Sequence, residues 1–314
     1  MAPICCVCCE KALLNSAHDH AFVHSIYRYV GICVVVRSGG QNMKQFVAPP
    51  WAPLTSAWTN RQLILTLTKR EIASRYQGSL LGWFWSAFNP VFMLVVYTFV
   101  FSVVFQARWA GGSGSKIEFA LMLFIGLIVF SFFAESVNRA PTLILGNASY
   151  VKKVVFPLEV LPWVVVLNSL FHAAVSLVIW LLAYTLFIGV PPVTVLLVPM
   201  VFLPLMLFTL GLCWILASLG VYLRDIAQMM PILTTVLMFL SPLFYPLDAV
   251  PKAFHFLFAF NPLAPAMEQM RAVSFMGKGI AWGQYAALLA GGACMAWAGL
   301  WWFQKTRRGF ADVL

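Results

Sequence analysis

Long runs of apolar residues with few charges constrain this chain more than any other feature. One run covers about residues 119–137 and another covers about 161–188. Each can supply the stretch of about 20 residues that a helix needs to cross a hydrocarbon layer of about 30 Å. Across the sequence 62% of the residues are hydrophobic and 10% are charged, a composition far from that of soluble domains. The chain is therefore predicted to be an all-α integral membrane protein.

The distribution of apolar and basic residues predicts six transmembrane helices. Their approximate ranges are 87–106, 119–137, 161–188, 193–223, 229–245 and 282–303. Lys and Arg gather before the first helix and after the second, fourth and sixth, and such an excess is typical of cytoplasmic loops. We therefore expect both termini in the cytoplasm. The net charge of +10 has the same origin, so it does not indicate nucleic-acid binding.

The part of the chain before the first span divides into two regions. Residues 1–57 are predicted to be a disordered tail and a Pro-rich linker, since residues 1–42 contain neither an apolar run of membrane-spanning length nor a signal-peptide cleavage site. Residues 58–86 are predicted to form a cytoplasmic interface helix whose basic side chains reach toward lipid headgroups. Residues 87–314 would then form the six-span domain.

The loop of residues 247–279, between the fifth and sixth spans, is apolar but interrupted by Pro251, Pro262 and Pro265. Broken backbone is tolerated in a membrane only where protein or water satisfies its polar groups. We expect short broken helices here that dip into the outer leaflet, and the proline spacing disfavours a seventh span.

Several kinds of chemistry lack their motifs in this sequence. There is no Gly-x-x-x-x-Gly-Lys-Ser/Thr loop, so ATP-driven transport would need a separate ATPase chain. The cysteines at 5, 6, 8 and 9 do not have the spacing of zinc ligands, so no metal site is predicted. His172 is the only titratable side chain well inside a predicted span, and a single His among apolar residues indicates packing more than proton transfer.

Outer-loop residues leave one enzymatic alternative open. Asp248, His255 and Glu268 could activate an acceptor in a membrane-embedded glycosyltransferase or polysaccharide ligase. No recognisable motif groups them into a catalytic site, and no catalytic residue is predicted.

A series of short motifs points to a family. Residues 69–90 read KREIASRYQGSLLGWFWSAFNP, residues 222–225 read YLRD, residues 241–246 read SPLFYP and residues 261–263 read NPL. In this order they resemble the permease subunits of type-2 ATP-binding-cassette exporters of lipid-linked polysaccharides, which include O-antigen, capsule and teichoic-acid exporters. The resemblance extends from about residue 63 to the C-terminus.

The resemblance implies an assembly and a substrate. The permease would work as a homodimer with two copies of an ATPase subunit, and that partner would bind ATP and Mg while this chain binds no cofactor. The substrate would be a polysaccharide, O-antigen first, on a polyprenyl diphosphate carrier. The chain would lie in the bacterial inner membrane, in contact with membrane lipid.

Three groups of residues follow from the resemblance as candidate sites. A coupling segment seated on the ATPase would comprise Asn147, Ser149, Tyr150, Val151, Lys152 and Lys153. The interface helix, its glycine hinge and its candidates for binding lipid phosphate would comprise Arg61, Arg70, Arg75, Tyr76, Gly78, Ser79, Gly82 and Trp85. Aromatic rings suited to stacking on sugars would line the polysaccharide pathway at Tyr97, Phe101, Phe105, Phe239 and Phe244.

The coupling segment gives a first testable prediction. Replacing Lys152 and Lys153 with Glu reverses two charges beside the docking helix, which should weaken its contact with the ATPase. We expect export to fall severalfold while the partner continues to hydrolyse ATP and the permease still inserts. Export and ATP hydrolysis measured on the same reconstituted complex check this. Wild-type export by the double variant would show that the charge of this loop does not matter to coupling.

Overall fold

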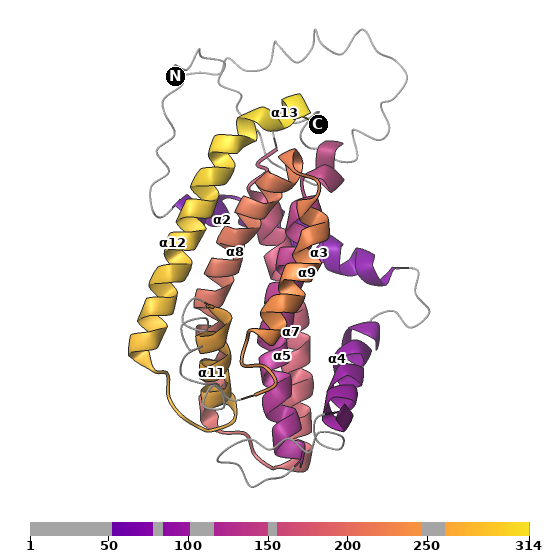
Figure 1. Ribbon diagram of the computed structural model, residues 1–314, viewed down its shortest axis with the longest axis vertical. Coiled ribbons are helices and arrows are strands. Elements are labelled where there is room, and N and C mark those ends of the chain that lie inside the picture. The colour runs from indigo at the N-terminus through magenta and orange to yellow at the C-terminus, as the bar shows by residue number, and fades with distance from the viewer. Residues whose placement is uncertain (1–51, 78–83, 101–115, 150–155, 246–260, 314) are drawn as a thin grey trace, which may run out of the picture. The chain divides into compact units, whose positions relative to one another are not determined.

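A computed structural model describes residues 52–77, 84–100, 116–149, 156–245 and 261–313 of the 314-residue chain (Figure 1). In these ranges every regular element is a helix, which confirms the predicted all-α class. The α-helices are α2 (Ala52–Thr59), α3 (Arg61–Tyr76), α4 (Phe84–Tyr97), α5 (Lys116–Arg139), α7 (Val160–Phe187), α8 (Val198–Tyr222), α9 (Ile226–Phe239), α11 (Leu263–Ser274), α12 (Trp282–Thr306) and α13 (Phe310–Val313). Short 3₁₀ turns lie at η2 (Ala140–Thr142), η3 (Leu145–Asn147), η4 (Val193–Leu197) and η7 (Arg307–Gly309).

Four helical segments of the described chain are long and apolar enough to cross a membrane. They cover Lys116–Thr142, Val160–Phe187, Val193–Tyr222 and Trp282–Gly309, and they coincide with the second, third, fourth and sixth predicted spans. Of two shorter apolar helical segments, Phe88–Val100 falls within the first predicted span and Ile226–Phe239 overlaps the fifth. The chain is thus a multi-pass membrane protein.

Helix α5 lies at the centre of the packing. It contacts α7, α8, α9 and α11, and nearly all its side chains from Phe119 to Phe133 are buried. One large aromatic side chain of α7 finds its hydrogen-bond partner on α5: the indole N–H of Trp180 donates to the carbonyl of Leu121 at 2.9 Å. Figure 1 shows α5 and α7 side by side along much of their length. An apolar layer offers no water to a polar group. The hydrogen bond to α5 therefore lets the indole of Trp180 be buried without an unpaired N–H.

Helices α8 and α12 approach each other through glycines. A Cβ atom added at Gly299 would lie 2.2 Å from the carbonyl oxygen of Gly211, and one added at Gly211 would lie 2.2 Å from that of Met295. Both distances are shorter than any real contact of a Cβ atom. Small residues at helix contacts let backbones come close, which is how helices gain packing energy where lipid and side chains are equally apolar.

The observed helix boundaries differ from the predicted ones at two places. Helix α2 begins at Ala52, so residues 52–57 are helical although they were assigned to the Pro-rich linker. Pro53 lies in the first turn, where its missing N–H has no partner to lose. The predicted interface helix of residues 58–86 is also divided at Asn60, between the end of α2 and the start of α3, and α3 ends at Tyr76.

The second difference concerns the fifth span, which was predicted to reach residue 245. Helix α9 ends at Phe239, and residues 240–245 turn away from it. Pro242 follows closely and disfavours helix before and at its own position. The predicted broken loop after this point does contain a short helix, α11, which begins directly after Pro262.

The glycine contact between α8 and α12 predicts a large effect of one methyl group. Gly299→Ala should destabilise the protein by about 1–3 kcal/mol, because the added carbon meets backbone and the helices must separate. The melting temperature of the detergent-purified protein measures this. Gly291→Ala lies on the same helix, and its added carbon has no atom of the described residues within 4 Å. It is the matched control and should be neutral or slightly stabilising. Equal melting temperatures for the two variants would contradict the close contact.

Candidate functional site

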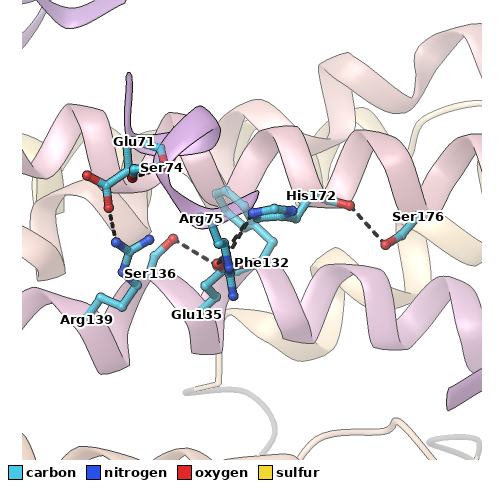
Figure 2. A network of polar contacts seen from close by, with 9 residues as sticks. All are labelled: Glu71, Ser74, Arg75, Phe132, Glu135, Ser136, Arg139, His172 and Ser176. Carbon is cyan, nitrogen blue, oxygen red and sulfur yellow. Dashed lines mark hydrogen bonds and ion pairs between the residues drawn. The ribbon is translucent and has the colours of Figure 1, made fainter. Parts of the chain in front are cut away.

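Two ion pairs join α3, the predicted interface helix, to the central helix α5 (Figure 2). Glu71 pairs with Arg139, and Arg75 pairs with Glu135. The members of each helix are four residues apart and therefore lie on one face. On α3 the acidic residue precedes the basic one in the chain, and on α5 the acidic residue also comes first. Because the two helices pair in antiparallel order, each carboxylate meets a guanidinium.

His172 on α7 completes this network. Its Nε2 lies 2.9 Å from Nη1 of Arg75 and 3.9 Å from Oε1 of Glu135. Since Arg has only donors, Nε2 accepts the hydrogen bond from Arg75, which places the proton of a neutral imidazole on Nδ1. The side chains of His172 and Glu135 are only 17% and 20% exposed. His172 is therefore packed and also hydrogen-bonded, and the expectation of packing over proton transfer stays a prediction. The three residues come from three different helices, so their proximity was not visible in the sequence.

The network lies at one end of a cavity of about 670 Å³ between α4, α5 and α7. Its polar lining includes Ser169, His172 and Ser176, which recur along one face of α7. The hydroxyl of Ser169 is buried and has no hydrogen-bond partner within the described residues. The apolar lining comes from residues of all three helices, among them Phe88, Met93, Tyr97, Phe124 and Leu127. Such a cavity suits an amphipathic ligand.

Three of the five predicted pathway aromatics form a row. The rings of Tyr97 and Phe244 are 6.0 Å apart between centroids, and those of Phe244 and Phe239 are also 6.0 Å apart. Tyr97 lines the cavity as well, so the row begins at the cavity wall. Phe101 and Phe105 lie outside the described residues.

The predicted interface-helix residues separate into groups. Arg75 is held by Glu135 and His172, whereas the guanidinium of Arg61 lies over the ring of Trp58 at 4.7 Å from its centroid. The side chain of Arg70 is exposed. Gly78, Ser79 and Gly82 lie outside the described residues, as do the side chains of Tyr76 and Trp85.

Only the start of the predicted coupling segment is described. The side-chain amide of Asn147 donates to the carbonyl of Leu143 at 2.9 Å and so closes the turn at η3, and Ser149 is exposed. Tyr150, Val151, Lys152 and Lys153 lie outside the described residues.

Sequence reasoning missed one functional candidate, Arg271 on α11. It lies in the predicted outer loop of residues 247–279, but it is only 2% exposed. Its guanidinium donates to the carbonyls of Met122, Pro242 and Leu243 at 3.1, 2.6 and 2.9 Å. The available signal was its place in an otherwise apolar loop, where a cation needs partners inside the protein.

A bundle of apolar helices with an amphipathic cavity, and a sequence without a nucleotide-binding loop, describe a membrane transport subunit. Residues 62–275 match the family model described as ABC-2 type transporter. The chain belongs to this family. This membership confirms the interpretation as a transport subunit over the glycosyltransferase or ligase alternative.

Curated relatives agree with the family match. The chain is 31% identical over 256 residues to the O-antigen export system permease protein RfbA of Myxococcus xanthus, which covers 81% of this chain and 96% of the relative. It is 26% identical over 254 residues to an RfbA protein of Klebsiella pneumoniae, with coverages of 80% and 95%. It is 24% identical over 209 residues to the polysialic acid transport protein KpsM of Escherichia coli, with coverages of 66% and 79%.

The network on α3 predicts a charge-specific effect on stability. Arg75→Glu places a second carboxylate beside Glu135, and we expect a loss of about 1–2 kcal/mol from the free energy of unfolding. The double variant Arg75→Glu/Glu135→Arg should recover most of that loss. Melting temperatures of the purified proteins report both effects. Arg70→Glu makes the same charge change at an exposed site on the same helix and should have little effect. A loss as large in Arg70→Glu as in Arg75→Glu would contradict the specific pairing.

Proposed function

We propose that this chain is the transmembrane subunit of an ATP-driven exporter of polyprenyl-diphosphate-linked polysaccharide, O-antigen in the first place, in a bacterial inner membrane. The observation that carries this proposal is the similarity to O-antigen permeases over 95–96% of their length. The lower identity and shorter match to a polysialic acid transport protein favour O-antigen over polysialic acid.

The proposed arrangement has six spans, with α4 and α9 as parts of the first and fifth and α3 at the cytoplasmic surface. Both termini are cytoplasmic, and α11 lies in the outer leaflet. The residues of α3 that meet α5 support this arrangement, because Glu71 and Arg75 pair with Arg139 and Glu135 at the C-terminal end of α5. The segment that follows carries Lys152 and Lys153 and is expected to be cytoplasmic. Two copies of the chain would assemble with two copies of an ATPase that binds ATP and Mg.

Substrate would enter the pathway from the cytoplasmic side, near α3. Arg70 is exposed and forms no ion pair within the described part of the chain, so it can bind a lipid phosphate, with Arg61 nearby on the same helix. Arg75 already pairs with Glu135, so it would have to exchange that carboxylate for the diphosphate. This makes Arg70 and Arg61 the first contacts and Arg75 a later one.

The sugar chain would pass the aromatic row of Tyr97, Phe244 and Phe239. Their rings present flat apolar faces of the kind that pack on the CH-bearing faces of sugars. The row is continuous with the cavity through Tyr97, which supports a pathway that leads from the polar network to the rings.

Deletion of the gene tests the function directly. We expect the strain to lose surface O-antigen and to accumulate the polymer on its lipid carrier inside the cell. Gel analysis of surface lipopolysaccharide and mass spectrometry of the extracted carrier lipid measure the two effects. Deletion of the partner ATPase gene is the control and should give the same result.

Two outcomes would change the assignment. Unchanged surface polymer together with an unchanged level of the carrier-linked precursor would refute export of this substrate. Loss of a capsular polymer with intact lipopolysaccharide would move the assignment from O-antigen to capsule.

A further inference from the structure

Helix α9 ends in a place where its backbone needs help from other elements. It has 14 residues and is therefore about 21 Å long, less than the roughly 30 Å of a hydrocarbon layer. The turn that follows is buried at Ser241, Pro242 and Leu243. The last carbonyls of a helix lack partners within the helix, and in an apolar environment the protein itself must supply donors.

The helix-end carbonyls of Leu237 and Phe239 accept from the hydroxyls of Ser241 and Tyr245. Arg271 supplies the donors for the turn that follows. Two of its nitrogens donate to the carbonyls of Pro242 and Leu243, and a third donates to the carbonyl of Met122 on α5. The guanidinium thus ties the turn after α9 to the central helix. A guanidinium can do this because it carries five N–H donors in a fixed plane.

A second group ties the same turn to α11. The side-chain amide of Asn261 donates to Oγ of Ser241 at 2.9 Å and to the carbonyl of Leu240 at 3.3 Å. Its Oδ1 accepts the N–H of Leu263 at 3.0 Å, in the first turn of α11. The SPLFYP and NPL motifs of the sequence therefore meet in space, and together with Arg271 they fix the path of the chain after α9.

Phe244 directly follows the clamped carbonyl of Leu243, and it is the middle ring of the aromatic row. We propose that Arg271 is a positioning residue for export: it holds the turn after α9 so that Phe244 stays between Tyr97 and Phe239. The inference rests on the proposed function, because it assigns Arg271 a role in the pathway that function requires. Arg271 itself does not touch the polysaccharide.

A double-mutant cycle separates positioning from a general structural role. Export per assembled permease is measured in a deletion strain complemented with wild type, Arg271→Gln, Phe244→Leu or both, with the amount of membrane-inserted protein used for normalisation. Arg271→Gln should lower this rate about three- to tenfold, and Phe244→Leu should lower it similarly. If Arg271 acts through Phe244, the double variant should be no slower than Phe244→Leu alone.

A substitution at Gly126 gives an independent way to disturb the hydrogen bonds of Arg271 to the turn after α9. A Cβ atom added there would lie 2.8 Å from Nη2 of Arg271 and 3.0 Å from Cδ1 of Leu243. Gly126→Ala should therefore reproduce the export defect of Arg271→Gln in weaker form, and its effect should also vanish in the Phe244→Leu background. Gly291→Ala is the matched control and should export normally. Arg271→Lys keeps the charge but offers one ammonium for three carbonyls, so it should restore export only in part.

Each outcome decides the proposal separately from the function. Normal export by wild type upholds the function whatever the variants do. If the double variant lowers export by the product of the two single-variant factors, Arg271 does not act through Phe244 and the positioning role is overturned. Normal export by Phe244→Leu would overturn it as well. If the Arg271→Gln protein does not accumulate in the membrane, Gly126→Ala or Arg271→Lys replaces it in the double-mutant cycle with Phe244→Leu. Failure of all three variants to accumulate would show that Arg271 serves folding instead.

Discussion

The need to satisfy every backbone polar group without water governs this structure. Long helices meet that need within themselves, which is why the described chain is helical throughout its regular parts. Where a helix stops short of the layer's thickness, as α9 does, the donors come from side chains. The buried guanidinium of Arg271 and the amide of Asn261 donate to the carbonyls of the turn after α9, so these polar side chains lie where the backbone is irregular.

Charge is used differently at the other end of the bundle. There α3 buries Ile64 in the apolar core and also meets α5 through two ion pairs of partly exposed side chains. Pairs of this kind contribute little free energy each and can be exchanged for other ions. Such contacts suit a surface helix that would take part in binding a charged lipid. The close glycine contact between α8 and α12 suits two helices that stay packed against each other.

Much of the fold was predictable from local sequence. Apolar runs located the four long spans within a few residues, because length and hydropathy are local properties. The failures were also local in origin. Prolines near Ala52 indicated a linker where α2 begins. The end of α9 at Phe239 was missed because the apolar run continues past it. The site was predictable only in part: the aromatic row brings together Tyr97, Phe239 and Phe244, but nothing near His172 in the chain revealed its partners.

The sequence by itself determined that this chain is a helical membrane protein, and its ordered motifs determined the family, since both follow from residue type and order along the chain. Only the tertiary structure decided which charges are internal. Arg75 and Arg271 look alike in sequence, yet one pairs with a carboxylate at the surface and the other donates to three buried carbonyls. The difference depends on which helix ends meet, and helix ends distant in sequence meet through packing that no local pattern records.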